Sequence, residues 1–309
     1  MSQSKPDSLA AAISRRLAAA TLPGEEPFTA AALAKAARFV RQTATRRRAG
    51  EATIAIETMP GAADERLTRI AVVDDDMPFI VDSLAAAIAA QGLTIKRLLH
   101  PVVTVRRDGD GVLTGIPERA AASDCLESMV YVETARADAR MRVNLQRALE
   151  TALADVRAAV TDWPAMRKAL ECDADDLAKG AADSEGAHLL RWLHGGMLTQ
   201  LGHVRRKRDG SQSGVLGICR KSTRELLAPA SYKRAFAWFD SRGKQAAACA
   251  PLIVKANVIS QIHRRVPLDL LIVPKLERGR VVALSVHAGI WTSAALAAPP
   301  GEVPRLRLG

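Results

Sequence analysis

The most distinctive polar residues of this chain are three consecutive aspartates at positions 74–76, which Met77 and Pro78 follow directly. They stand between an apolar segment and a stretch with helical spacing, where a strand is expected to meet a helix. One interpretation is a helix cap, in which Asp75 or Asp76 accepts from exposed amides and Pro78 occupies the first turn. A small-ligand site at those amides is the second. A divalent-metal site is the third, although three adjacent side chains point in different directions and would need outside ligands.

The histidines and cysteines follow no metal-binding pattern. The six histidines form no HxH or HExxH pair; they are His100, His188, His194, His203, His263 and His287. The four cysteines form no CxxC pair and are expected to be reduced thiols; they are Cys125, Cys172, Cys219 and Cys249. No serine stands in a nucleophile elbow and no GxGxxG motif follows a strand, so we assign no catalytic residue, metal ligand or cofactor to this segment. His100, before Pro101, is expected to be a buried, hydrogen-bonded histidine or a pH-sensitive contact with a partner.

Hydrophobic periodicity places the aspartates inside an α+β domain. Ile80, Leu84 and Ile88 recur at the fourfold spacing of a buried helix face, and Gly92 is expected to stop that helix. Strand, helix, strand, strand, helix is the order expected, which is close to a ferredoxin-like arrangement. The expected elements are strands at 51–59, 67–73, 93–106 and 127–134, helices at 77–91 and 138–160, a break at Asp162-Trp163-Pro164, and a helix at 164–178.

Three regions are predicted along the chain. Residues 1–50 are expected to be helical, at 8–20 and 28–48 with a break at Pro23-Gly24; residues 51–180 contain the strand–helix domain; residues 181–309 follow a polar stretch at 179–184. Alternating residues in the last region predict a mainly antiparallel sheet with few helices, and Asp209-Gly210-Ser211 predicts a hairpin turn. The expected elements there are a helix at 185–193 and strands at 198–206, 214–220, 252–258, 266–275 and 280–290.

Composition narrows the class of protein. The 309 residues are 48% hydrophobic and 25% charged, as in an ordinary globular protein. No run approaches the roughly 18 apolar residues of a membrane span, and no secretion signal is evident, so we expect a cytoplasmic protein without a membrane partner. The net charge of +11 raises nucleic acid as a partner. The basic clusters at 46–48, 205–208 and 264–265 are short and aromatic residues are scarce, which favours surface charge or contact with an acidic neighbouring domain.

A series of short motifs, headed by DDMPFIVDS at residues 75–83, resembles the N-terminal region of the large bacterial NAD-specific glutamate dehydrogenases. His100-Pro101 follows at the family's spacing. Further matches occur in the same order along the chain; they include Glu127-Ser128, Asp155-Val156-Arg157, Asp162-Trp163-Pro164, Leu190-Arg191-Trp192-Leu193, Leu216-Gly217-Ile218 and Trp291-Thr292-Ser293. The second half matches less closely, because the family has aromatic residues after Leu201-Gly202 and after His263-Arg264.

Members of that family are very long chains, with ACT-like modules and a PAS-like module at the N-terminus and the NAD-binding catalytic domain far downstream. The resemblance therefore implies an ACT-like first domain and a PAS-like second domain, cut at a junction near Pro304-Arg305-Leu306-Arg307 or surviving as a free-standing relic. ACT-like modules bind small amino acids where the first strand meets the first helix. This implies a set of ligand-binding or contact residues: Asp75, Asp76, Met77, Pro78, Asp82, Ser83 and His100.

We therefore predict a non-catalytic regulatory and assembly region of a large NAD-specific glutamate dehydrogenase. Oxidative deamination of glutamate to 2-oxoglutarate, with NAD as cofactor, would belong to a missing catalytic domain. The expected partners are an amino-acid effector, that downstream domain, and other subunits of a homo-oligomer. Two alternatives remain, a stand-alone ACT-type amino-acid-sensing regulator of a separate enzyme and a basic nucleic-acid-binding adaptor whose affinity would fall steeply with salt.

Overall fold

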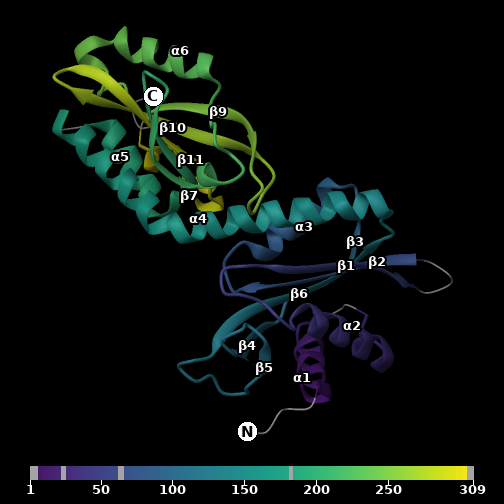
Figure 1. Cartoon of the computed structure of the whole chain (residues 1–309). Helices are drawn as coiled ribbons and strands as arrows, with labels where there is room; N and C mark the ends of the chain where they lie inside the picture. Colours follow the sequence, from purple (N-terminus) through teal and green to yellow (C-terminus); the bar gives the residue numbers. More distant parts are fainter. Residues whose placement is uncertain (1–5, 22–25, 62–65, 181–183, 305–309) are drawn as a thin grey trace. The chain divides into compact units, whose positions relative to one another are not determined.

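The computed structural model describes residues 6–21, 26–61, 66–180 and 184–304 and divides into two compact units, residues 1–153 and 154–309. Figure 1 shows a sheet with helices in each unit. The predicted break at Pro23-Gly24, residues 181–183 of the polar stretch, and Arg305-Leu306-Arg307 of the predicted junction lie outside the described residues. None of the described helices combines the length and the apolar character needed to cross a membrane.

The first unit is built on an antiparallel sheet in the order β1-β2-β6-β4-β5, with β3 also paired to β6. Eight directly paired residues join β1 to β2, and nine join β2 to β6. The chain therefore passes from β2 through a helix to β4, while β6 lies between these two strands. The strands are β1 (Thr53–Pro60), β2 (Arg66–Asp75), β3 (Ile95–Leu99), β4 (Val102–Arg107), β5 (Leu113–Gly115) and β6 (Cys125–Ala135).

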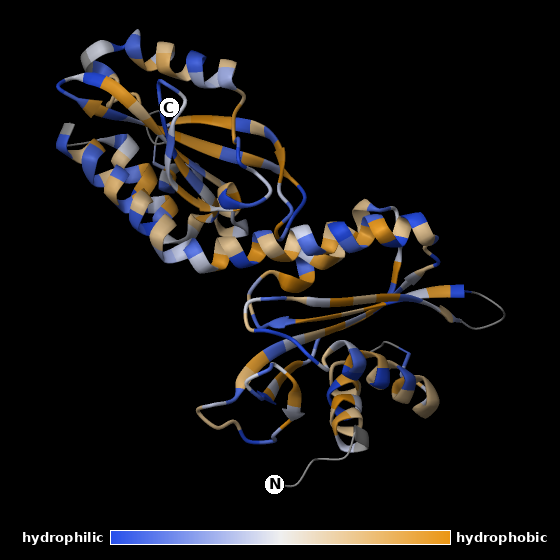
Figure 2. Ribbon diagram, in the orientation of Figure 1, coloured by the Kyte–Doolittle hydropathy of each residue, from blue (hydrophilic) through white to orange (hydrophobic). Residues whose placement is uncertain are grey.

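Helices cover both faces of this sheet (Figure 1). α1 (Pro6–Ala19) and α2 (Ala30–Thr43) bury Ile13, Leu17 and Val40 in one core with Met129 and Tyr131 of β6. The alternate strand residues point to the other face, where α3 (Ile80–Ala90) and the start of α4 (Ala139–Gly180) lie. In Figure 2 hydrophobic and hydrophilic residues alternate around α1, as expected for a helix with one buried face.

One prediction for this unit needs correction, and another is confirmed. The predicted strand at 93–106 is interrupted at His100-Pro101, where β3 ends and β4 begins. Proline has no N–H for a strand ladder, and the carbonyl of Pro101 accepts from the amide of Met129 at 3.0 Å. The predicted helix stop is confirmed, because α3 ends at Ala90 and Gly92 has a φ of 74°.

The second unit contains a five-stranded antiparallel sheet in the order β8-β7-β11-β10-β9. Arg206 of β7 and Arg208, which follows β7, stack on Tyr232 and Phe236 of α6, and this helix covers one face of the sheet. The intervening residues of β7 face the other way, toward α4. The strands are β7 (Leu198–Lys207), β8 (Gln212–Gly217), β9 (Leu252–Ile259), β10 (Pro267–Glu277) and β11 (Arg280–Trp291), and the helices are α5 (Glu185–Trp192), α6 (Pro229–Asp240) and α7 (Ser293–Ala297).

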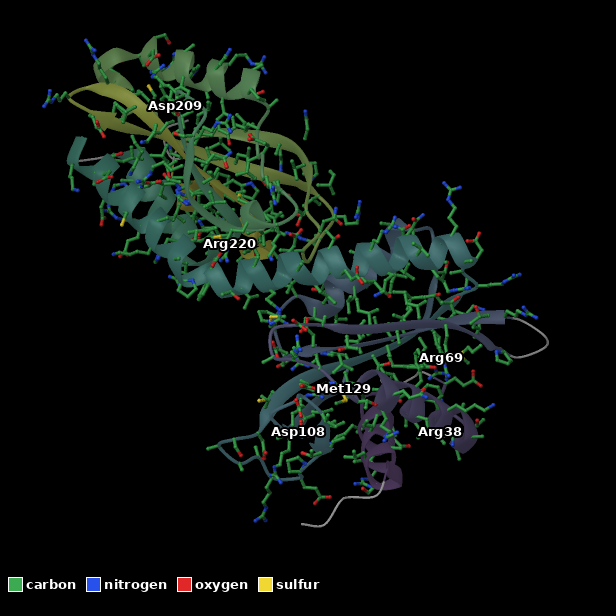
Figure 3. All side chains as sticks on the ribbon, viewed as in Figure 1. Arg38, Arg69, Asp108, Met129, Asp209 and Arg220 are labelled. Atoms are coloured by element: carbon green, nitrogen blue, oxygen red, sulfur yellow. The ribbon has the colours of Figure 1, made fainter. Side chains whose placement is uncertain are left out.

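The predicted helix break at Asp162-Trp163-Pro164 is wrong, because α4 continues through Pro164 to Gly180. Tertiary contacts hold the helix there: the carboxylate of Asp162 accepts from the amide of Gly217 at 2.8 Å and from Arg220 at 2.8 and 2.9 Å. Figure 3 labels Arg220 beside α4, and Asp209 at the predicted β7–β8 turn. Because residues of α4 beyond Leu153 pack on the second sheet, the division between the units falls inside α4 and not in the polar stretch at 179–184.

Two further differences concern the second sheet. α6 was not predicted, because its alanines, lysine and arginine are interrupted by aromatic residues of weaker helix propensity, and Pro229 at its start is equally compatible with a loop. The strand predicted at 214–220 is β8 (Gln212–Gly217), and a 3-10 turn occupies Ile218–Arg220. Gly217 has a φ of 61°, which leaves the extended region and ends the strand.

Candidate functional site

The predicted site lies on the turn that joins β2 to α3. β2 ends at Asp75 and α3 begins at Ile80, so Asp76, Met77 and Pro78 precede the helix. Phe79 is the N-cap residue, and its φ of 73° lies in the left-handed region that favours glycine. A bulky residue in that conformation stores strain, which the surrounding contacts must balance.

The prediction that Asp75 or Asp76 caps α3 is wrong. Phe79 occupies the cap position and provides no side-chain hydrogen bond there. The carboxylate of Asp75 instead accepts from Arg47 at 2.7 Å and from the amide of Gly50 at 3.0 Å. The carboxylate of Asp76 accepts from the hydroxyl of Ser128 at 2.7 Å. Donors that are distant in sequence therefore bind the two aspartates, which were expected to cap the helix next to them.

Asp76, Ser128 and His100 form a chain of hydrogen bonds. Nε2 of His100 lies 2.8 Å from Oγ of Ser128, and Oγ of Ser128 lies 2.7 Å from Oδ1 of Asp76. The serine hydroxyl donates to the carboxylate, so it accepts from Nε2–H of the histidine. This direction is opposite to that of a nucleophilic serine, whose hydroxyl donates to the histidine. The chain is suited to recognition or proton transfer to the exposed Asp76, and not to attack by Ser128.

His100 is only partly exposed, and this sets its protonation. Burial lowers the pKa of His100 below its ordinary value, and the negative charge of Asp76 opposes that effect without cancelling it. The imidazole is therefore neutral at physiological pH and becomes charged only under acidic conditions. A neutral ring that donates through Nε2 offers Nδ1 as its acceptor nitrogen.

A buried cluster of arginines and carboxylates lies beside the turn. The side chains of Arg47 and Glu127 are 2% and 0% exposed, and they meet at 2.6 Å. Arg107 donates to both oxygens of Glu127, at 2.7 and 2.8 Å. Burial lowers the pKa of Arg47, but the hydrogen bonds and charges of Glu127 and Asp75 outweigh it and hold that pKa above its ordinary value.

This arginine–carboxylate cluster fixes the position of the turn at Asp76. Arg47 follows α2, Arg107 ends β4, and Glu127 lies near the start of β6, so three segments are joined at one carboxylate. Asp75, the last residue of β2, is bound to the same arginine. The cluster therefore holds the end of β2, which the turn at Asp76 follows. Its members bind one another through these ion pairs.

The structure places the other predicted residues as follows. Met77 and Pro78 lie on the turn, and Asp82 is exposed in the first turn of α3. Ser83 is 0% exposed on the buried face of α3, and its amide donates to the carbonyl of Phe79. The structure thus brings Asp76 and His100 together through Ser128, and leaves Asp82 outside that chain.

Four central residues were not predicted as site residues; they are Arg47, Arg107, Glu127 and Ser128. Arg47 belongs to a basic run that we interpreted as surface charge, yet it is among the most buried charged residues described. Glu127-Ser128 was noted only as a sequence match. The signal that could have found them was the polar pair Glu127-Ser128 at the head of an otherwise apolar strand.

Comparisons with known proteins agree with this architecture. Residues 11–149 match the family model of the glutamate dehydrogenase ACT1 domain. A NAD-specific glutamate dehydrogenase of Halomonas elongata is 26% identical over 262 residues, covering 78% of this chain and 16% of that protein. The corresponding enzyme of Pseudomonas aeruginosa is 27% identical over 259 residues, with the same coverage of 78% and 16%.

A solved structure of an RNA-binding Light-Oxygen-Voltage receptor is 12% identical and covers 94% of this chain and 91% of that one. Its TM-score of 0.18 carries no argument about fold.

The sheets and the family match define a mixed α+β protein that contains an ACT-type domain. Its sequence resembles that of the N-terminal region of the large NAD-specific glutamate dehydrogenases. The chain spans about 16% of the length of the relatives it matches.

Proposed function

We propose that this chain is a regulatory and assembly region of a NAD-specific glutamate dehydrogenase, without a catalytic centre of its own. It would bind an amino-acid effector or contact other subunits of a cytoplasmic homo-oligomer, and so bias a catalytic domain that lies elsewhere in the enzyme and binds NAD. That domain would convert glutamate to 2-oxoglutarate. The match of residues 11–149 to the ACT1 domain is the observation that carries the proposal.

We propose a ferredoxin-like ACT fold for the first unit. The order β1-β2-β6-β4 supports it, because β2, α3 and β4 form a βαβ unit split by the antiparallel strand β6. In this arrangement β1, which precedes the unit in sequence, takes the edge position beside β2. The resulting architecture is a two-layer βαββα domain with β1 as an added edge strand. The α1–α2 pair covers the other face of its sheet.

We propose a PAS-like fold for the second unit. Counted along the chain, its five strands lie in the order second, first, fifth, fourth, third. The longest connection, from β8 to β9, contains α6 and sits between the second and third strands. That order of strands and that placement of the helical segment support the proposal.

The proposed effector site is the turn from Asp76 to Phe79. An amino acid carries an ammonium and a carboxylate, so it needs an anionic group and amide donors close together. Asp76 is exposed on the turn, whereas Asp75 is bound by Arg47. α3 begins immediately afterwards, and the first amides of a helix favour a carboxylate. His100 would report the occupancy of Asp76 through Ser128.

Calorimetric titration of the purified chain with each of the common amino acids tests effector binding. We expect one amino acid to bind, and Asp76→Asn to weaken it at least tenfold because the ammonium loses its charged partner. Glu57→Gln, an exposed carboxylate on β1, is the matched control and should leave binding unchanged. Flat titrations for every amino acid would remove the effector role and leave assembly, which sedimentation of the same sample tests.

The non-catalytic assignment has a separate test. Incubation of the purified chain with glutamate and NAD should give no NADH above the rate of a protein-free blank. Sustained, glutamate-dependent NADH formation that scales with the concentration of the chain would overturn this part of the proposal.

A further inference from the structure

The second unit buries two histidines and an aspartate together. His203 of β7 and His287 of β11 are direct cross-strand partners, and their ring centroids lie 4.7 Å apart. Asp173 reaches them from α4, and the exposed fractions of the three residues are 3%, 0% and 1%. One nitrogen or oxygen atom of each lies within 4.8 Å of the others. Three side chains of types that bind metals therefore converge in the interior from three different elements.

His203 is held in the tautomer of a metal ligand. Its Nδ1 lies 2.8 Å from the carbonyl oxygen of Gly214, which can only accept, so Nδ1 carries the hydrogen. Nε2 then presents a lone pair, to which the hydroxyl of Ser285 donates at 2.9 Å. A carbonyl on one ring nitrogen and a lone pair on the other is the usual arrangement of a ligating histidine.

His287 has a neighbour that points to the same role. Its Nε2 lies 2.7 Å from Oδ2 of Asp173, and its Nδ1 lies 3.0 Å from the amide nitrogen of Gln200. Gln200 is 4% exposed, and its amide oxygen has no hydrogen-bond partner among the described residues. Rotation of this amide by 180° exchanges its nitrogen and oxygen, so that the oxygen accepts a hydrogen bond from Nδ1–H of His287. In that tautomer of His287 the lone pair is on Nε2, which faces Asp173.

Asp173 has one oxygen available for an ion. Its Oδ1 accepts from the ammonium of Lys275 at 2.5 Å, and its Oδ2 faces His287. Lys275 also contacts Asp176 at 2.7 Å, and Lys179 binds Asp176 at 3.0 Å, so two ammonium groups stand beside two carboxylates. The ion pair with Lys275 favours the ionised carboxylate, which is the form that binds a metal.

We propose that Asp173, His203 and His287 bind one divalent ion of the late first-row metals, with Zn²⁺ the best fit. Two imidazole nitrogens and one carboxylate oxygen are ligands that such ions prefer. Tetrahedral bonds of about 2.1 Å place ligand atoms roughly 3.4 Å apart, so rotation of the histidine side chains closes the site. The ion replaces the hydrogen bond between His287 and Asp173, and the hydroxyl of Ser285 stands beside the fourth position.

An open cavity lies beside Lys275, which binds Asp173. Lys275 lines an open cavity of about 640 Å³ together with Arg205 and Ser213. Lys179 and Lys207 also line it, and its four basic residues outnumber Asp176 and Glu277, so this surface is expected to slow the approach of cations. Metal titrations of this chain must therefore be followed to equilibrium.

Equilibrium dialysis of the purified chain against Zn²⁺, with elemental analysis, tests the proposal. We expect one ion per chain, and at least tenfold weaker binding in both His203→Asn and His287→Asn. The exposed His188 of α5 provides the matched control, because His188→Asn should bind as the parent chain does. Unchanged binding in both cluster variants, or no stoichiometric binding by the parent chain, would overturn the proposal.

Two measurements cover the remaining alternatives. Ring-nitrogen NMR signals of His203 and His287 in the parent chain should move on adding Zn²⁺, which needs no substitution and so does not depend on whether the variants fold. Cys172 is exposed next to Asp173 and could bind the ion through its thiolate. If Cys172→Ser abolishes binding and a thiolate-to-metal absorption band appears with Co²⁺, the site is a surface cysteine and the proposal fails.

Discussion

Replacement of the buried carboxylate of Glu127 by an amide, Glu127→Gln, is the sharpest test of the arginine–carboxylate cluster. The side chain is 0% exposed and accepts four hydrogen bonds, two from Arg47 and two from Arg107. The substitution preserves shape, removes the negative charge, and turns one acceptor into a donor that faces a guanidinium. Arg47 then retains Asp75 and the buried Asp74 as anionic partners, whereas Arg107 loses the carboxylate that it binds.

The magnitude follows from the burial of the partners. Removal of one member of a buried ion pair costs about 3–5 kcal/mol, since the remaining charge stays desolvated. The amide oxygen can still accept from one guanidinium, so we expect the lower end, about 3 kcal/mol. A matched substitution, Glu57→Gln, removes a carboxylate that is 46% exposed and paired with Arg69. Exposed pairs contribute under about 1 kcal/mol, so the two variants should differ by at least 2 kcal/mol.

Hydrogen exchange measured peptide by peptide separates the two units. A loss of about 3 kcal/mol should accelerate exchange in β6 peptides roughly 100-fold in Glu127→Gln. The four tryptophans, at 163, 192, 238 and 291, all belong to the second unit, so urea unfolding followed by tryptophan fluorescence should be unchanged. Equal exchange in the Glu127→Gln and Glu57→Gln variants would refute the reasoning, because the cluster would then contribute no more than a surface pair.

Three further predictions follow from the same unit or its neighbour. His100→Asn should reduce the loss of stability below about pH 6.5, because the pKa of His100 is lowered in the folded state and the unfolded chain takes up the proton first. This one group changes the free energy of unfolding by at most about 1.4 kcal/mol per pH unit, and by less here because it is partly exposed. Urea unfolding of the parent chain and of His100→Asn at several pH values measures the difference. If the free energies of unfolding of the two proteins fall in parallel with pH, the prediction is contradicted. Phe79→Gly should be about 1 kcal/mol more stable than Phe79→Ala in thermal unfolding, since φ is 73° there, and the reverse order would show that the left-handed conformation relaxes. Gly217→Ala should cost more than about 2 kcal/mol in tryptophan-detected unfolding, because its Cβ would lie 2.1 Å from the carbonyl oxygen of Leu201, whereas Gly195→Ala meets nothing within 4 Å and should cost far less.

Local patterns predicted the elements that depend on local forces. The stripe of Ile80, Leu84 and Ile88 is buried on α3, Gly92 follows the end of that helix, and the turn at Asp209-Gly210-Ser211 joins β7 to β8. Each of these depends on side-chain periodicity or on a backbone angle that glycine adopts easily. The family resemblance added the ACT domain, which periodicity alone does not distinguish from other α+β modules.

The errors arose where residues distant in sequence determine the hydrogen-bond partners or the burial of a side chain. Asp75 was expected to cap the helix that follows it, but Arg47, 28 residues earlier, binds it. Asp162 was expected to lie in a helix break, but it holds Gly217 and Arg220, more than 50 residues later. The buried metal-type cluster joins Asp173 to His287 over 114 residues, which no local pattern can show. Burial of charge depends on these pairings, so the sequence could not reveal that Arg47 is internal.

The pairing of Arg47 with Glu127 across 80 residues has a consequence for synthesis of the protein. α1 and α2 leave the ribosome first, but the strand that covers their apolar residues, β6, is made much later. At about 5–20 residues per second, synthesis of the 95 residues from Val40 to Ala135 takes roughly 5–19 s. During that interval Ile13, Leu17 and Val40 are without their final neighbours, and the nascent chain offers chaperones a short apolar segment until translation has passed Ala135.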